Sequence, residues 1–195
     1  MENPVIPAEK LVIIQDCSRQ SRERLQYLLD NGFMWFSLRD EVSSAMAMAL
    51  FIEQILPMLE AYHASLSSHR QQFFLAEQFP LLGLHWQVPL LPTLEGRDKG
   101  KSLWGCSCHG AQEIEQATAA GVDYITLSPV YPPISKQSFL PPLGEEQFSA
   151  LCKQTHLPVL ALGGMRPSML PAMKNLGAAG IALMGGVMGD VEKIY

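Results

Sequence analysis

Two stretches near the end of the chain decide the fold: Leu160-Ala161-Leu162-Gly163-Gly164-Met165-Arg166-Pro167 and Ile181-Ala182-Leu183-Met184-Gly185-Gly186-Val187. In each stretch an apolar run of strand length ends in Gly-Gly. Glycine lets the backbone approach a ligand closely and tolerates positive φ angles. One such pair by itself is more simply a turn. Two pairs after the last two strands of a β/α barrel form a phosphate cradle, so we expect phosphate binding at Gly163, Gly164, Gly185 and Gly186.

Outward from these stretches, strand-length apolar runs alternate with helical patterns along the chain. The expected strands cover residues 11–16, 34–39, 64–68, 81–86, 102–108, 124–130, 158–164 and 180–187. Residues 88–101 are rich in Pro and Gly, and little chain follows the last strand. Such alternation favours parallel strands with right-handed crossovers. We therefore predict an α/β fold, a single (β/α)8 TIM barrel domain over residues 1–195, with reduced helices after strands four and eight.

An open doubly wound sheet is the competing architecture. That fold usually carries Gly-x-Gly-x-x-Gly after its first strand. No such motif follows residues 11–16, which favours the barrel.

The composition narrows the classes of partner. The 195 residues are 48% hydrophobic and 17% charged with a formal net charge of −5, which is typical of a globular chain without the basic stripe that binds nucleic acid. No apolar run is long enough to span a membrane, and the first ten residues lack a signal-peptide pattern. We expect a cytoplasmic protein with small-molecule partners, for which a homodimer is compatible with the sequence. The cysteine spacing, Cys-x-Cys rather than Cys-x₂-Cys, indicates free thiols.

Polar side chains stand where several expected strands end: Asp16, Arg39, Ser68, His69, His85, Ser107, His109 and Ser128. In a β/α barrel the active site lies at these ends. Because side chains alternate along a strand, Ser37 and Arg39 share one face, and so do Ser107 and His109. Arg39 can bind phosphate oxygens through two nitrogens, and Lys136 can add a point charge from the loop after the sixth strand.

The charged residues also have a structural interpretation. Arg39 can pair with Asp16 or Asp40 instead of with an anion. The carboxylates of Asp40 and Glu41 are most simply solvated loop charges.

The histidines also divide into a structural and a functional group. His85 lies in an apolar strand and is more simply a core histidine with satisfied hydrogen bonds. His69 and His109 are better candidates for proton transfer.

An ordered series of motifs resembles the thiamine phosphate synthase/TenI family over nearly the whole chain, most strongly from Gly105 onward. Gly105-Cys106-Ser107-Cys108-His109 resembles the family's G-x-S-x-H, and Pro158-Val159-Leu160-Ala161-Leu162-Gly163-Gly164-Met165 resembles P-V-V-A-I-G-G-I. Gly121-Val122-Asp123-Tyr124-Ile125, Ser128-Pro129-Val130-Tyr131-Pro132 and Ser135-Lys136 resemble G-A-D-Y-I/V, G-P-I/V-F-P-T and T-K. Gly83-Leu84-His85 is similar to G-V-H, and Leu38-Arg39-Asp40-Glu41 to L-R-E-K.

The resemblance implies a β/α barrel enzyme of thiamine biosynthesis. Its synthase branch joins a hydroxymethylpyrimidine diphosphate to a thiazole phosphate through a pyrimidine carbocation and releases diphosphate. Mg²⁺ and cationic side chains stabilise the leaving diphosphate. By this resemblance the candidate catalytic residues are Arg39, Lys136, Ser107 and His109. The candidate substrate- and phosphate-binding residues are Gly163, Gly164, Gly185, Gly186, Ser128 and His69.

The chain departs from the synthase pattern at several positions. Ser37 stands where the family has a glutamine and Glu41 where it has a lysine. A Ser67-Ser68-His69-Arg70 stretch replaces the family's Asn-Asp after the third strand, and residues 86–89 lack the aspartate expected after the fourth. Neither of the usual Mg²⁺ carboxylates has a match, so the sequence leaves the metal ligands unknown.

Two alternatives stay open beside the synthase. The TenI branch shifts a double bond in a thiazole phosphate carboxylate by acid–base chemistry and needs no metal, but its catalytic histidine at the end of strand six is Ser128 here. A non-catalytic member would bind only a thiazole or thiamine phosphate. We expect the synthase, with Mg²⁺ as cofactor, because coupling is the commoner activity of the family.

Overall fold

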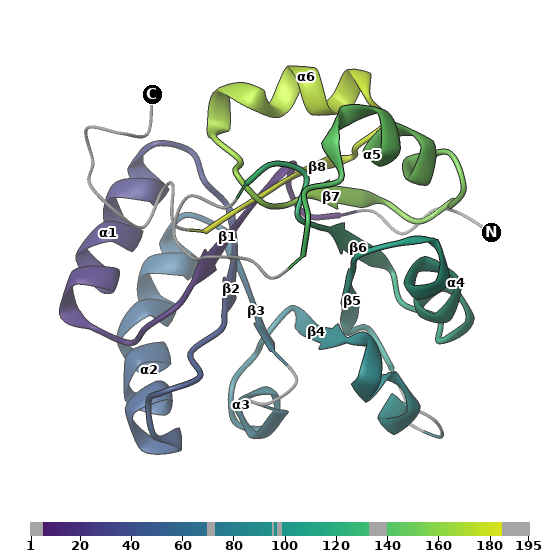
Figure 1. Ribbon diagram of the computed structural model, residues 1–195. Coiled ribbons are helices and arrows are strands. Elements are labelled where there is room, and N and C mark those ends of the chain that lie inside the picture. Colours follow the sequence, from purple (N-terminus) through teal and green to yellow (C-terminus); the bar gives the residue numbers. More distant parts are fainter. Residues whose placement is uncertain (1–5, 70–72, 95, 97–98, 133–139, 185–195) are drawn as a thin grey trace.

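A computed structural model shows eight parallel strands that close into a barrel in chain order (Figure 1). It describes residues 6–69, 73–94, 96, 99–132 and 140–184. The strands are β1 Lys10–Ile14, β2 Trp35–Leu38, β3 Ser65–His69, β4 Gly83–Gln87, β5 Leu103–Cys108, β6 Tyr124–Leu127, β7 Val159–Ala161 and β8 Gly180–Leu183. β8 closes the ring by pairing with β1, with Lys10 beside Ile181. The predicted (β/α)8 barrel is confirmed.

Helices surround the strands in Figure 1. They are α1 Arg19–Asp30, α2 Ala45–Ala61, α3 Phe73–Gln78, α4 Ala111–Ala119, α5 Gly144–Cys152 and α6 Leu170–Asn175, with the 3₁₀ helices η2 Val88–Leu94 and η3 Pro167–Met169. The reduced helix predicted after strand four is confirmed, because η2 takes its place. The segment after β8 lies beyond Met184, outside the described residues. None of the helices in the described ranges is long and apolar enough to cross a bilayer.

Local sequence fixes where the two longest helices begin. Ser18 lies just before α1 with an extended backbone, and its Oγ accepts a hydrogen bond from the Ser21 N–H. Ser44 caps α2 in the same way through the Ala47 N–H. Each serine satisfies one of the N–H groups that a helix leaves unpaired at its start. These caps end the strand-to-helix loops and so fix the places of Asp16 and Arg39 on those loops.

The strands separate two apolar layers. Inside the ring, side chains from five strands pack into one cluster: Leu11, Ile13, Trp35, Tyr124, Leu160 and Ala182. The alternate residues, such as Val12 and Phe36, pack outward against the helices. This is the alternation that a closed barrel requires.

Gly105 makes room for the ring of Tyr124 in the barrel interior. A Cβ added to Gly105 would lie 2.2 Å from Cζ of Tyr124. Only glycine therefore allows the Tyr124 ring to lie against β5. The ring also meets Trp35 edge-on, with centroids 5.0 Å apart, and its hydroxyl reaches β4. The packing of small against large side chains thus positions the first group of the site.

Candidate active site

The barrel interior becomes polar toward the C-terminal ends of the strands. The inward-facing positions there hold Ser37, Ser67, His69, His85, Ser107 and Thr126. All of these except Ser107 are buried. Strand alternation puts them on the same face as Trp35 and Tyr124, and the Trp35 Nε1–H confirms this by donating to Ser67 Oγ at 3.2 Å. The C-terminal end of the barrel is the end at which this fold places its active sites.

His85 is the centre of a buried hydrogen-bond network. Its Nδ1 lies 3.1 Å from the Tyr124 hydroxyl and its Nε2 lies 2.8 Å from Ser107 Oγ. Thr126 also donates to Ser107 Oγ, at 3.3 Å. The network therefore joins β4, β5 and β6, and both ring nitrogens of His85 are used, as expected for a core histidine.

Protonation fixes the direction of these bonds. Burial, followed by the nearby charge of Arg39, lowers the pKa of His85 to about 3, so the ring is neutral and carries one N–H. Burial also raises the pKa of Tyr124, which keeps its phenol protonated. We assign the Tyr124 O–H as donor to His85 Nδ1, and the Nε2–H as donor to Ser107. Ser107 then accepts two hydrogen bonds, and its own O–H remains to donate toward the mouth of the barrel.

His69 lies beside His85 at the end of β3. The two residues are register partners, and their ring centroids are 5.0 Å apart. Burial lowers the pKa of His69 well below its usual value, and the neighbouring His85 and Arg39 lower it further. His69 is therefore a neutral imidazole at pH 7. This is less favourable for a general base than sequence reasoning expected, since the ideal pKa for proton transfer lies near the working pH.

Arg39 supplies the positive charge at the mouth. Its backbone N–H donates to the Ile14 carbonyl at 2.8 Å, which fixes the turn out of β2. Its guanidinium forks onto Glu41, with Nε and Nη2 each 3.0 Å from Oε1. The expected alternative pairing with Asp16 or Asp40 is therefore wrong. An ion pair this exposed adds little stability, so Arg39 can exchange Glu41 for an anion at small cost.

Asp40 is a structural residue and not the solvated loop charge that the sequence suggested. The side chain is buried and accepts backbone N–H bonds from Cys17, Val42 and Ser43 at 2.8–2.9 Å. Burial acts to raise the pKa of Asp40, but the hydrogen bonds from Ser43 and Val42 outweigh it and lower the pKa. The carboxylate remains ionised because these hydrogen bonds stabilise its negative charge, and the same bonds organise the loop after β2.

The described residues do not fit a magnesium site. No group of three or more His, Cys, Asp or Glu side chains among them is arranged to hold a metal ion. Asp40 is committed to three backbone donors. The strand ends that would supply carboxylates in the synthase pattern carry Ser68, His69 and Trp86 instead. Hydroxyl and imidazole groups are poor substitutes, because Mg²⁺ prefers carboxylate, carbonyl and water oxygens.

His109 and Ser128 meet at the ends of β5 and β6. Nδ1 of His109 lies 2.6 Å from the Ser128 carbonyl oxygen and 3.3 Å from Ser128 Oγ. A carbonyl can only accept, so Nδ1 carries the proton and Nε2 is the basic nitrogen. The His109 backbone N–H donates to Glu113 at 2.6 Å. Ser128 thus holds the exposed His109 ring, and Glu113 holds the His109 backbone.

Gly163 and Gly164 adopt positive φ angles of +95° and +69° just after β7. A Cβ on Gly163 would lie 2.8 Å from Pro129 Cα, and one on Gly164 would lie 2.7 Å from Tyr131 Cβ. The glycines therefore let the loop after β6 pack closely on the loop after β7. Their predicted phosphate contact remains a prediction. Three other candidates, Lys136, Gly185 and Gly186, lie outside the described residues.

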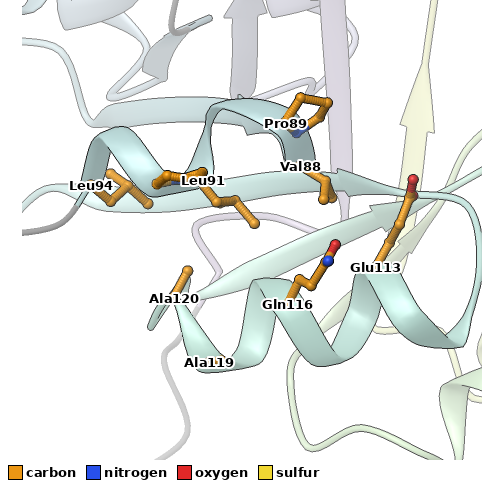
Figure 2. A pocket seen from close by; sticks show the side chains of 9 residues that line it. Val88, Pro89, Leu91, Leu94, Glu113, Gln116, Ala119 and Ala120 are labelled. Atoms are coloured by element: carbon orange, nitrogen blue, oxygen red, sulfur yellow. The ribbon is translucent and has the colours of Figure 1, made fainter.

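A separate cavity lies outside the ring of strands. It has a volume of about 770 Å³ and lies between η2 and α4, lined by Val88, Pro89, Leu91, Pro92, Leu94, Glu113, Gln116, Ala119 and Ala120. Figure 2 shows Val88 and Leu91 facing α4, with Gln116 reaching up from that helix. None of the predicted site residues lines it. The cavity follows from the replacement of a full helix by η2, which covers less of the barrel surface.

Sequence reasoning missed three interior residues of the site. Tyr124 and Thr126 were read only as strand residues, although they alternate with Ser128 along β6 and so share its face. Ser37 was placed on the same face as Arg39 and noted as a departure from a family pattern, but it was given no role, although its Oγ is buried and has no hydrogen-bond partner. The same period-two test applied to β6 would have found Tyr124 and Thr126.

Comparison with known proteins gives a consistent picture. The family model described as thiamine monophosphate synthase matches residues 11–187. A Geobacter sulfurreducens protein with a provisional thiamine-phosphate synthase name is 43% identical over 112 residues, which are 56% of this chain and 53% of that protein. The chain thus matches about half of that relative's length. A Bacteroides fragilis thiamine-phosphate synthase is 27% identical over 175 residues, covering 85% of this chain and 84% of the relative.

Solved structures support the same fold. A thiamine phosphate pyrophosphorylase from Pyrococcus furiosus superposes with a TM-score of 0.75 at 20% identity, covering 95% of this chain and 90% of the other. A protein of the same name from Bacteroides thetaiotaomicron gives a TM-score of 0.63 at 25% identity, covering 90% of this chain and 82% of the other.

Proposed function

The chain belongs to the thiamine monophosphate synthase family, and from this membership we propose that it joins a hydroxymethylpyrimidine diphosphate to a thiazole phosphate. In this reaction the bond between the pyrimidine methylene carbon and the diphosphate oxygen breaks, and diphosphate leaves with the electron pair. The thiazole nitrogen then donates its lone pair to the methylene carbon, which forms the new C–N bond of thiamine phosphate.

The observation that carries the proposal is the placement of Arg39 at the mouth of a polar barrel interior. Its fork-shaped guanidinium suits phosphate oxygens. Ser107 adds an O–H donor, which His85 and Thr126 hold in place from behind. Charge stabilisation of this kind, aimed at the group that becomes more negative, is usually the largest single contribution to catalysis.

The neutral state of the two buried histidines also suits this chemistry. Ionisation of the substrate leaves a positive methylene carbon beside a negative diphosphate. An imidazolium within the barrel would oppose the carbocation, whereas the neutral rings of His69 and His85 do not. Arg39, whose side chain is partly exposed, supplies a positive charge for the diphosphate at the barrel mouth.

We further propose the remaining roles by family resemblance. Lys136 would assist Arg39, and Gly163, Gly164, Gly185 and Gly186 would hold the thiazole phosphate. His69 and Ser128 would line the substrate site, and His109 would contact the reacting groups from the rim. These roles rest on motif positions. The proposed partners are a small pyrimidine and a small thiazole phosphate, bound by one barrel domain.

The test is a direct product assay. The full chain is incubated with both substrates at saturation, with and without Mg²⁺, and thiamine phosphate is measured by mass spectrometry. Formation of thiamine phosphate and diphosphate in equal amounts supports the proposal. Complete absence of thiamine phosphate in every condition, with a folded protein, removes it.

One observation favours a second candidate, the thiazole tautomerase. The His109 imidazole lies against Ser128, at the end of strand six, where the tautomerase branch keeps its catalytic histidine. With its proton on Nδ1, His109 presents a basic Nε2. Incubation with the thiazole phosphate carboxylate alone, without pyrimidine or metal, would give the isomer in that case. Binding of the thiazole phosphate without either product would identify a binding protein.

A further inference from the structure

We infer that the mouth of this barrel binds its phosphate groups directly, through Arg39 and neutral hydroxyl and imidazole groups, and does so without a divalent cation. The inference rests on the proposed function for the identity of the anion as a diphosphate. It departs from the Mg²⁺ that the family resemblance implies. Three features of the described residues lead to it.

The first feature is that the carboxylates around the mouth, among the residues that the structure describes, already have structural partners. Asp16 accepts bonds from the Ser18 N–H and the Ser21 hydroxyl at 3.0 and 2.7 Å, and Asp40 accepts three backbone N–H groups. Glu113 binds the His109 N–H. Recruiting any of these to a cation would break the loop that it organises.

Glu41 differs from these carboxylates because it is more exposed, but it too already has a partner. It is half exposed and already neutralised by Arg39. A cation on Glu41 would have to displace the guanidinium, and it would then face the released positive charge. An incoming diphosphate meets the opposite situation, because it can take the place of Glu41 on Arg39.

The second feature is the chemistry of β3 and β4 at their C-terminal ends. His69 is 4% exposed and lies against the His85 ring. Both nitrogens of His85 are already bonded, so a metal ion would find at most one free imidazole there. Burial lowers the pKa of both His69 and His85, and the nearby positive charge of Arg39 lowers both further. This environment disfavours a further cation.

The third feature is a supply of unused donors. Ser37 Oγ is buried, 1% exposed, and has no hydrogen-bond partner. It lies on the same inward face as Arg39, about 7 Å along the strand by the ordinary rise per residue. A buried hydroxyl without a partner is unfavourable, and a phosphate oxygen would satisfy it. Ser107 offers its O–H from β5. The interior thus presents donors, which is what an anion requires.

Calorimetric titration of the full chain with inorganic pyrophosphate tests the inference. We expect measurable binding in EDTA and no more than about a threefold gain in affinity when Mg²⁺ is added. A gain of about tenfold or more, equal to ~1.4 kcal/mol, would overturn the inference. Absence of binding in EDTA would overturn it as well.

A substitution sharpens the test. His69→Asp restores a carboxylate at the end of β3 and should weaken pyrophosphate binding in EDTA by about tenfold, because two negative groups then face each other. Added Mg²⁺ should recover much of this loss in the variant only. His156→Asp, an exposed site after α5, is the matched control and should behave as wild type. Equal binding by His69→Asp and wild type in EDTA would contradict the inference.

The product assay keeps the two proposals separate. Thiamine phosphate formation together with pyrophosphate binding that requires Mg²⁺ would leave the proposed function standing and overturn the metal-free site. Pyrophosphate binding in EDTA without thiamine phosphate formation would leave the metal-free site standing and overturn the proposed function. Circular dichroism of each variant shows whether a lost signal reflects lost folding.

Discussion

The barrel interior has two halves, a lower half away from the C-terminal ends of the strands and an upper half at those ends. Both follow the same alternation of side chains along the strands, but their chemistry differs. The lower half is filled by apolar side chains and the Trp35–Tyr124 ring pair. The upper half holds two histidines and several hydroxyl groups, nearly all buried. Burying polar groups is unfavourable unless they are bonded; most groups of the upper half are bonded to one another, but the Ser37 hydroxyl has no partner. The comparison suggests a division of roles: the apolar lower half stabilises the barrel, and the polar upper half is the part that we propose for binding.

Trp35→Ala should have the largest effect of the changes considered and should act on stability. Trp35 is fully buried in the lower half and contacts Tyr124. Loss of such a ring leaves a cavity and typically costs about 3–5 kcal/mol. Denaturant unfolding measures the change, and Val42→Ala at a fully exposed position is the control. A loss below about 1 kcal/mol would show that the lower half does not carry the stability assigned to it.

Arg39→Ala should separate binding from stability. Removing one group that stabilises developing charge typically lowers the rate by about 10²–10³. We expect this loss in thiamine phosphate formation, whereas unfolding should change little because the Arg39–Glu41 pair is exposed. Arg19→Ala removes a comparable exposed ion pair on α1 and should leave the rate unchanged. Equal rates for both variants would place the anion site elsewhere.

Acid should destabilise the protein through the buried histidines of the upper half. The pKa of His85 is about 3 in the folded protein and 6.5 without its surroundings. The unfolded chain therefore binds more protons between these values, so stability falls as pH decreases through this window. Between pH 7 and pH 5 the loss from His85 is about 2 kcal/mol.

Unfolding at a series of pH values measures this dependence. The His85→Gln variant should show a flatter curve over the same interval. Burial lowers the pKa of His69 as well, so some dependence should remain in the variant. A wild-type curve that is flat from pH 7 to pH 5 would contradict the neutral histidines.

Tyr124→Phe tests the hydrogen bond that joins Tyr124, whose ring packs in the lower half, to His85 in the upper half. The change keeps the ring beside Gly105 and Trp35 but removes the O–H that donates to His85. The expected cost to stability is about 1 kcal/mol, the usual net value of a hydrogen bond. The activity should fall by more than this suggests, because the His85 ring can then turn its N–H away from Ser107. Unchanged activity would show that Ser107 needs no orientation.

Ser37→Ala should have the smallest effect on stability. Its hydroxyl is buried without a partner, so its removal should be neutral or slightly stabilising, within about 0.5 kcal/mol. Pyrophosphate affinity should fall by a few-fold at the same time. A clear loss of stability would mean that the hydroxyl already serves the fold. Ser67→Ala, at a serine whose Oγ accepts from Trp35, is the matched control and should destabilise.

The sequence predicted the barrel because the barrel depends on local patterns. Apolar runs, helical patterns and the Pro- and Gly-rich segment before β5 each act over a few residues. It also predicted His85 as a core histidine with satisfied hydrogen bonds. Its partners could not be predicted, because the contact of Tyr124 with His85 depends on strand register across 39 positions of the chain.

The roles of the loop charges escaped prediction for a related reason. Asp40 is flanked by charged and polar neighbours in the sequence and so was taken for a solvated residue. The fold brings the Cys17 N–H of the previous loop to its carboxylate at 2.9 Å, and the side chain becomes buried. Arg39 likewise pairs with Glu41, two residues further along the turn after β2, and not with Asp16 or Asp40.

A crystal structure of the full chain with pyrophosphate in EDTA tests the central claim most directly. We predict that the anion lies at the mouth of the barrel, within hydrogen-bond distance of the Arg39 guanidinium and Ser107 Oγ. The Glu41 contact of Arg39 should be broken in that complex. An anion bound elsewhere, with the Arg39–Glu41 pair intact and the upper interior unchanged, would contradict the assignment of the polar half of the barrel as the active site.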